Sequence, residues 1–317
     1  MKGIIVVPIV LGSVLLLAGG AVFGVALYKG SKNTTIETKE YTSTELGSEF
    51  NKFDIDLTIA DLEFKTGEQK VVVDETKYDS HTVEVVDGTL KVKGLDNRKW
   101  YEHIFNWNWF DRVKVTVYMP AGSYQDLKIE TNTGNVVIPA DYSFASFDVS
   151  VDTGKVTNKA NVTEDIKVKS ATGDVVMEDV TAKNMEVKTS TGDIKLKNVT
   201  LSGDFESSTS TGDANLDNVT CVDYTSKSST GYVDFKNVNV TSHVDIKNGT
   251  GHVKMVDSDA GSLYIKTSTG GVRLQLLSSK ICQVKASTGK PSYPTSTTGG
   301  LCEVETSTGN INISWAA

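Results

Sequence analysis

The sequence predicts an all-β protein: a single-stranded parallel β-helix, or solenoid, of about ten coils of 19–20 residues, with an irregular β N-terminal cap and one N-terminal transmembrane helix. Three observations predict this fold. A Thr-Gly pair recurs at a nearly constant interval, apolar residues within each interval alternate with the period of a β-strand, and a long uncharged apolar run stands at the N-terminus. A fixed period near 20 residues is typical of a solenoid.

The apolar run covers residues 3–28 and is bracketed by Lys2 and Lys29. As a helix it would span about 39 Å, which exceeds the ~30 Å hydrocarbon core of a bilayer. We therefore expect residues 1–30 to be a retained single-pass membrane anchor; the alternative is a signal peptide cleaved after Ala26. Lysines on both flanks leave the orientation open. We expect a protein of the cell membrane with its β-domain on the extracytoplasmic side.

Residues 31–47 are polar and are expected to form a linker. Residues 48–125 alternate between apolar and polar side chains but lack the Thr-Gly repeat, which predicts an irregular β cap over the exposed first coil. Within this region Asp87-Gly88 separates two alternating runs and predicts a tight hairpin.

The cap region also contains an aromatic segment at residues 100–110, which holds three of the four tryptophans. Two roles are open for it: a plug over the apolar end of the solenoid, or a patch that binds a partner or the membrane interface, because Trp and Tyr favour both. The candidate binding residues are Trp100, Tyr101, Phe105, Trp107, Trp109 and Phe110.

The solenoid itself is predicted for residues 126–317. Its ten repeat glycines, each preceded by threonine, are Gly134, Gly154, Gly173, Gly192, Gly212, Gly231, Gly251, Gly270, Gly289 and Gly309. Apolar residues follow each glycine in pairs two positions apart, such as Val175 and Met177, which is the strand period. We expect three short strands per coil, each pointing two side chains inward, and a tight corner at the glycine. Because the spacing alternates between 19 and 20 residues, one corner must accept an extra residue.

The last two coils carry further expectations. Two prolines within residues 290–294 remove ladder donors, which predicts a surface loop in the ninth coil. The tenth coil, which ends at Ile313-Ser314-Trp315, is expected to be the exposed end of the rod and able to self-associate end to end. Cys282 and Cys302 should stack in neighbouring coils. With Cys221 we expect them to be buried free thiols, because stacked Cβ atoms about 4.8 Å apart exceed the usual disulfide span.

The segments FDIDLTIADLEFKTGE at 53–68, DGTLKVKG at 87–94 and VKVTVYMPAG at 113–122, together with the repeated (S/T)xTGD, resemble the bacterial putative-adhesin family, also called the toast-rack domain. The resemblance covers nearly everything after the linker. It implies an all-β repeat domain, commonly membrane-linked and associated with adhesion or cell-envelope stress responses. It implies no catalytic residues.

Several kinds of chemistry are excluded or weak. The formal net charge of −8 argues against a nucleic-acid partner, because duplex binding needs a basic face. The sequence has no GxSxG elbow, phosphate loop or dinucleotide fingerprint, so we expect no enzyme and no cofactor. Three stacked carboxylates are a weak metal candidate; the alternative role is a turn bond within each coil. These residues are Asp174, Asp193 and Asp213.

Together these features predict a membrane-tethered, non-enzymatic solenoid that acts as a surface-interaction or envelope-stress module, whose partner is an unknown protein or glycan. One alternative is an ice- or carbohydrate-binding solenoid that uses threonine columns, because pairs such as Thr189 and Thr191 recur. A less favoured alternative is a polysaccharide hydrolase, which would need carboxylates clustered on one lateral face.

Overall fold

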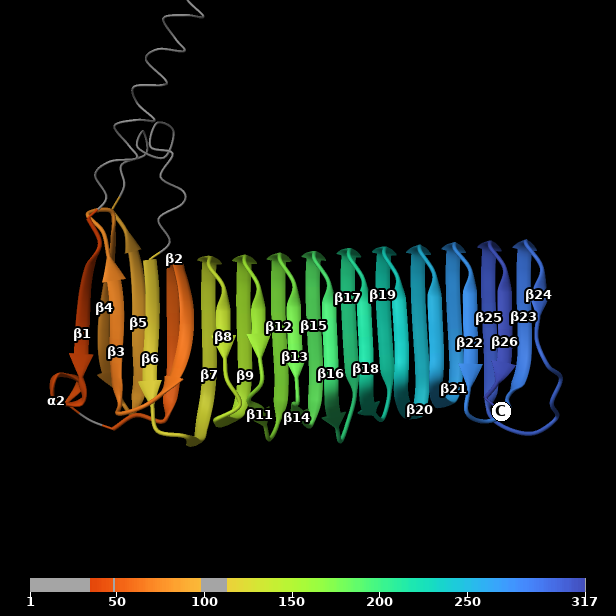
Figure 1. Cartoon of the computed structure of the whole chain (residues 1–317), viewed down its shortest axis with the longest axis horizontal. Helices are drawn as coiled ribbons and strands as arrows, with labels where there is room; N and C mark the ends of the chain where they lie inside the picture. The colour runs from red at the N-terminus through yellow and green to blue at the C-terminus, as the bar shows by residue number, and fades with distance from the viewer. Residues whose placement is uncertain (1–34, 48, 98–112, 317) are drawn as a thin grey trace, which may run out of the picture.

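The computed structural model describes residues 35–47, 49–97 and 113–316, and it shows a straight rod of stacked β-coils (Figure 1). The predicted membrane anchor at 1–30 and the aromatic segment at 100–110 lie outside the described residues. Among the residues that are described, no helix is long and apolar enough to cross a membrane. The parallel β-solenoid of about ten turns that the repeat predicts is confirmed.

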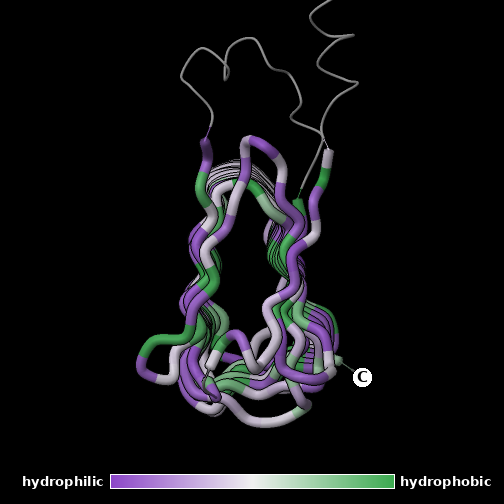
Figure 2. Tube along the Cα trace, turned by 90° about the vertical axis from the view of Figure 1, so that its left-hand side faces the viewer, coloured by the Kyte–Doolittle hydropathy of each residue, from purple (hydrophilic) through white to green (hydrophobic). Residues whose placement is uncertain are grey.

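Most of the repeat strands pair in parallel with the strand one coil away. In chain order they are β7 (Gly122–Thr133), β8 (Val136–Ile138), β9 (Tyr142–Thr153), β10 (Val156–Asn158), β11 (Asn161–Val162), β12 (Asp165–Thr172), β13 (Val175–Glu178), β14 (Thr181–Ala182), β15 (Asn184–Thr191), β16 (Ile194–Leu201), β17 (Phe205–Thr211), β18 (Ala214–Cys221), β19 (Tyr224–Thr230), β20 (Val233–Thr250), β21 (Val253–Thr269), β22 (Val272–Leu276), β23 (Ile281–Thr288), β24 (Pro291–Ser292), β25 (Leu301–Thr308) and β26 (Ile311–Trp315). Viewed along the rod, the coils superpose on one outline (Figure 2).

The glycine corner is possible only because its residue lacks a side chain. All ten repeat glycines have φ between 138° and 157°. A Cβ at any of them would lie 1.8–2.2 Å from the carbonyl oxygen of the corner residue in the adjacent coil. Backbone hydrogen bonds tie the corners together, as from Gly192 N to Thr211 O at 2.9 Å.

A second corner lies six residues after the glycine and uses a left-handed residue. Asn198 and Asn218 stand there with φ of 53° and 58°, a conformation that Asn and Asp tolerate better than other side chains. The third corner accepts the extra residue, because Met185, twelve positions after its glycine, pairs with Phe205, thirteen after its own. The predicted variable corner is therefore confirmed and located.

The interior is a set of stacked apolar columns, such as Val175, Ile194 and Ala214, which pair across three coils and are buried. Burying each such side chain contributes roughly 1.5–3 kcal/mol for the larger aliphatics. A polar column lies under the glycine corner, where Thr189 Oγ1 donates to Gly173 O at 3.4 Å. Its buried threonines are Thr131, Thr189, Thr209, Thr267 and Thr306.

The N-terminal end differs from the predicted boundary at residue 126. The strands before it are β1 (Glu37–Thr42), β2 (Lys52–Thr66), β3 (Lys70–Glu75), β4 (Asp79–Val86), β5 (Thr89–Asp96) and β6 (Val113–Met119), with helix α2 (Ser43–Leu46). β2 pairs in parallel with β7 and β8 on one side and with β5 and β6 on the other, so the coils begin before residue 126. The expected linker at 31–47 contains β1 and α2 in its described part.

Three antiparallel pairings lie at this end: β1 with β3, β3 with β6, and β4 with β5. The predicted hairpin at Asp87-Gly88 is confirmed, with φ of 50° and 70° at its two residues. Inside the first coils Phe53 packs edge-on against Phe50, Phe64 and Phe144 at centroid distances of 5.6–5.9 Å. Aromatic rings of the described strands therefore fill this end of the interior.

The C-terminal coils are stacked out of chain order. β25 pairs with β21 on one side and with β23 on the other, and β26 lies between β22 and β24. The tenth coil is thus inserted between the eighth and the ninth, and the ninth ends the rod (Figure 1). The expectation that the tenth coil is the exposed end was wrong, although β24 covers only the first two residues of β26. The physical reason is Pro291, because proline lacks a ladder donor and is confined to edge strands.

The surface loop predicted at residues 290–294 is confirmed in part: Pro291–Ser292 form β24, and the loop over residues 293–300 returns the chain from the ninth coil to the inserted tenth. The cysteine predictions also hold in their main part. Cys302 pairs with Cys282 in the adjacent coil, and all three cysteines are free. Cys221 and Cys302 are buried; Cys282 is half-buried because its coil ends the rod.

A candidate interaction face

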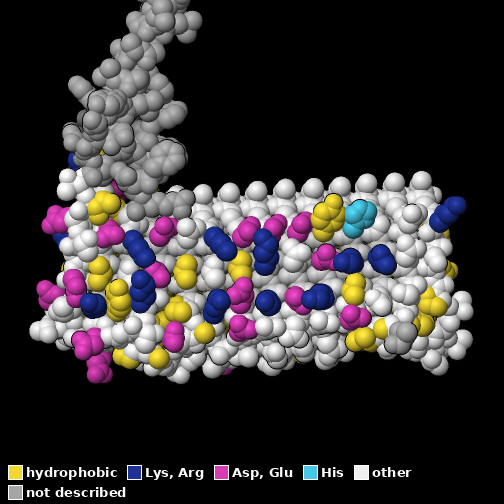
Figure 3. Space-filling model, in the orientation of Figure 1, with side chains coloured by type: hydrophobic (Ala, Val, Ile, Leu, Met, Phe, Trp, Pro, Cys, Tyr) yellow, Lys and Arg dark blue, Asp and Glu magenta, His cyan; other side chains and the backbone are white. Residues whose placement is uncertain are grey.

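The strands that follow the glycine corners form one lateral face of the rod, which we call the ladder face. In each coil the first residue after the glycine is half-buried or exposed, and these residues stack into a column that we call the corner column. Figure 3 shows basic and acidic side chains interspersed along the rod. The face is built by regular backbone, so its outward positions repeat at the coil spacing of about 4.8 Å.

The predicted carboxylate column belongs to this face and has a structural role. Asp174 Oδ1 accepts a hydrogen bond from Asp193 N at 3.0 Å, and Asp193 Oδ1 accepts one from Asp213 N at 2.9 Å. Each carboxylate therefore bonds the backbone of the next coil. The turn bond expected within each coil was wrong, because each carboxylate accepts instead from the backbone N–H of the same corner in the next coil.

The ammonium group of Lys195 lies between two of these carboxylates, in the position considered for a metal ion shared by the column. Lys195 Nζ lies 3.0 Å from both Asp174 Oδ2 and Asp193 Oδ2. The backbone hydrogen bond from Asp193, together with Lys195, lowers the pKa of the Asp174 carboxyl. Within the described ranges no group of three or more His, Cys, Asp or Glu side chains could hold a metal ion.

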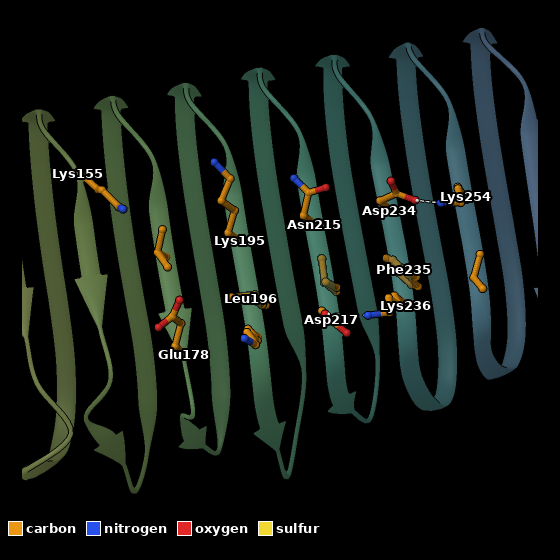
Figure 4. Close-up of a pocket in the computed structure, with 14 residues that line it drawn as sticks. Lys155, Glu178, Lys195, Leu196, Asn215, Asp217, Asp234, Phe235, Lys236 and Lys254 are labelled. Atoms are coloured by element: carbon orange, nitrogen blue, oxygen red, sulfur yellow. Dashed lines mark hydrogen bonds and ion pairs between the residues drawn. The ribbon is translucent and has the colours of Figure 1, made fainter.

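A first groove of about 550 Å³ crosses the middle coils of the ladder face (Figure 4). Figure 4 shows Lys195, Asn215, Asp234 and Lys254 on successive coils along it, with Lys155 two coils before Lys195. Opposite charges pair across its coils, with Lys254 Nζ 3.7 Å from Asp234 Oδ1. Charged side chains that partly neutralise one another therefore line the groove, together with apolar ones such as Leu196 and Phe235.

A second groove, of about 840 Å³, continues the first toward the C-terminal end and shares Asp234 and Lys254 with it. Its aromatic side is the corner column, where the rings of Tyr232 and His252 lie parallel, 4° apart, with centroids 5.5 Å apart. The next residue in that column is Gly271, which leaves the groove without a side chain at that point.

The threonine pairs do not form an outward double column. The first threonine of each pair is buried under the corner, and the second is exposed, as Thr189 and Thr191 show, except for the half-buried Thr133. The ice- or carbohydrate-binding alternative that relied on both columns is therefore not supported by the geometry.

The carboxyl groups do not favour a hydrolase either. Among the described residues, lysine partners or backbone donors lower the pKa of every carboxyl group whose pKa is displaced, namely Glu63, Asp174 and Glu186. A glycosidase needs a general acid whose pKa is raised.

The predicted aromatic binding residues, Trp100 to Phe110, lie outside the described residues. The aromatic pair at Tyr232 and His252 was missed as a site, although both depart from the Asp or Asn found at the same place in five of the other eight coils. That departure was the available signal.

The chain is similar to one protein family and to several proteins of known structure. A family profile described as Toastrack DUF4097 matches residues 50–209 and again residues 202–317. A comparison with curated proteins gives no match. A putative adhesin of known structure from Bacteroides fragilis NCTC 9343 is 14% identical, with 86% of this chain and 97% of that chain covered and a TM-score of 0.36.

Two proteins of known structure from Parabacteroides distasonis ATCC 8503 are also similar. A putative adhesin is 15% identical, with 86% of this chain and 98% of that chain covered and a TM-score of 0.45. A putative lipid binding protein is 13% identical, with 87% of this chain and 96% of that chain covered and a TM-score of 0.43.

Proposed function

The chain belongs to the Toastrack DUF4097 family, and from this premise we propose that it is a membrane-tethered, non-enzymatic surface-interaction protein. Its solenoid is a rigid spacer whose lateral face contacts the partner. The family resemblance extends the proposal to adhesion or to a cell-envelope stress response, each of which needs a binding surface and no catalysis.

The observation that carries this proposal is the ladder face with its two adjoining grooves. The grooves are open, both are lined by charged and apolar side chains, and they share Asp234 and Lys254, so a long ligand can follow them along several coils. Many weak contacts at a regular spacing add up through multivalency. The backbone ladder makes the face rigid, which lowers the entropy lost on binding.

The position of β1 supports the tether. Glu37 pairs with Glu75 of β3, and β3 runs antiparallel to β6, so the start of β1 lies level with Val113, the first residue of β6, with β3 between them. Val113 in turn pairs with Ala60, which stacks on the first repeat glycine. The chain therefore enters the rod at its N-terminal end, on the edge formed by the glycine corners. With residues 1–30 as anchor, that edge of the first coils is the part nearest to the membrane.

The test is protease accessibility on intact bacterial cells that express the full-length chain. We expect the chain in the membrane fraction, with added protease removing the β-domain from intact cells and leaving a cytoplasmic marker protein intact. A matched chain with residues 1–30 replaced by a cleavable signal peptide should leave the membrane fraction. A β-domain protected in intact cells, or a full-length chain found in the soluble fraction, would refute the tethered surface role.

A further inference from the structure

We propose that the second groove binds an acidic sugar residue of a glycan, with the sugar ring on the Tyr232–His252 pair and its carboxylate on Arg273. This inference rests on the proposed function, because it names the ligand class of the same face. Three features of the groove carry it: an exposed aromatic pair, an unpaired arginine, and a gap in the corner column.

The aromatic pair lies at the surface of the groove. Tyr232 is 50% exposed, so about half of the residue remains open to a ligand. Its backbone is held by Asp213, whose Oδ1 accepts from Tyr232 N at 2.7 Å. The C–H bonds on one face of a pyranose carry partial positive charge, which the electron-rich face of an aromatic ring attracts.

His252 is also held in place. Its Nδ1 lies 2.8 Å from Gly271 N, which donates to it, so the neutral ring carries its proton on Nε2. Because Nδ1 is occupied by the backbone, Nε2 is the nitrogen left to donate to a sugar hydroxyl. The ring is thus oriented before any ligand arrives, which reduces the cost of binding.

Arg273 supplies the charge. It is exposed, lines the groove, and has no carboxylate within ion-pair distance among the described residues, whereas neighbouring Lys254 is paired with Asp234. A guanidinium presents a planar fork that fits a carboxylate with two parallel hydrogen bonds. An unpaired arginine beside an aromatic pair is therefore complementary to a ring that carries a carboxylate.

Gly271 leaves the space. A Cβ there would lie 3.2 Å from both Asn310 O and His252 Nδ1, so a side chain at this lining position would crowd the His252 ring. Asn310 and Asn312 line the far side, and their amides can bond sugar hydroxyls. Asn310 and Asn312 lie beside this groove because β26 of the inserted tenth coil pairs with β22, with Ile311 opposite Val272. The groove volume of about 840 Å³ falls in the range of small-ligand sites.

The test measures binding of three probes to the full-length chain by isothermal titration calorimetry. The probes are a hyaluronan tetrasaccharide, which carries glucuronate rings, N-acetylchitotetraose, which is neutral, and inorganic phosphate, which has charge but no ring. We expect the hyaluronan tetrasaccharide to bind at least about tenfold more tightly than either of the others, since charge-assisted hydrogen bonds are among the strong ones. Equal affinity for the neutral probe, tightest binding of phosphate, or no binding of any probe would overturn the proposal.

Variants locate the site. Tyr232→Ala, Arg273→Gln and Gly271→Asn should each weaken tetrasaccharide binding about tenfold or more. Tyr264→Ala and Lys285→Gln remove an aromatic ring and a positive charge outside the groove and should leave binding within about twofold. An unchanged melting temperature excludes misfolding as the cause. If the groove variants bind as well as the wild type, the assignment fails, while the protease test still decides the tethered role separately.

Discussion

Replacing a single repeat glycine by alanine should destabilise the rod far more than an ordinary surface substitution. We take Gly212, which lies in the middle of the stack with φ of 144°. The added Cβ would lie 2.0 Å from Gly192 O, more than 1 Å inside normal contact, and the obstacle is backbone rather than a flexible side chain.

The magnitude follows from two costs. A residue other than glycine in this backbone region costs on the order of 1–3 kcal/mol. Moving the corner out of contact by about 1 Å stretches the two hydrogen bonds beside it, from Gly192 N to Thr211 O at 2.9 Å and from Ile194 N to Asp213 O at 2.8 Å. Each is worth about 0.5–1.5 kcal/mol. The sum is a loss of about 2–6 kcal/mol.

The assay is urea unfolding followed by circular dichroism, with the slope compared between variants because long repeat arrays can lose cooperativity. The matched control is Gly122→Ala, because a Cβ at Gly122 would meet nothing within 4 Å and its backbone is not left-handed. The control should stay within about 0.5 kcal/mol of the wild type. If Gly212→Ala is equally mild, or if the control is equally costly, the steric explanation of the repeat is wrong.

Three further predictions concern buried polar groups. Burial lowers the pKa of His81 from 6.5. Just below pH 6.5 the histidine therefore binds a proton more readily in the unfolded chain than in the folded chain. Stability should fall as the pH drops below about 6.5, and His81→Gln should flatten that dependence in melts from about pH 5 to 8. Lys280 Nζ lies 2.8 Å from Asp259 Oδ1, and only 5% of the lysine side chain and 19% of the aspartate side chain are exposed. Asp259→Asn should therefore lower the free energy of unfolding, measured in urea, by about 3–5 kcal/mol. Adding Lys280→Met should recover part of this loss of stability. Ellman's reagent should label Cys282 first in the folded chain, because burial raises the pKa of the Cys221 and Cys302 thiols to about 12. Equal labelling rates at all three cysteines would contradict this prediction.

The architecture of the rod could be predicted from the sequence because its causes are local. Each coil has a glycine at its corner and apolar residues two positions apart, and these features act within that coil. The same pattern recurs at a nearly constant period. The asparagine corner at Asn198 and Asn218 was equally local, and its recurrence six residues after the glycine was visible in the sequence.

The start of the coils could not be predicted in the same way. β2 lacks the Thr-Gly pair and has Ala60 at the corner, so the repeat pattern does not mark it as a coil. Its parallel partners β5 and β6 come later in the chain, and the pairing depends on contacts between segments far apart in sequence.

The order of the last coils and the contents of the second groove were decided by tertiary structure alone. The residues Leu263, Cys302 and Cys282 hold the same place in their coils and are all apolar, so the apolar pattern does not specify which coil lies next to which. The lost donor of Pro291 is least costly at an edge, which places the ninth coil at the end and brings Asn310 beside Gly271. The local sequence pattern thus determines the shape of each coil. The order in which the coils stack, which depends on contacts between segments distant in sequence, determines which side chains lie next to one another.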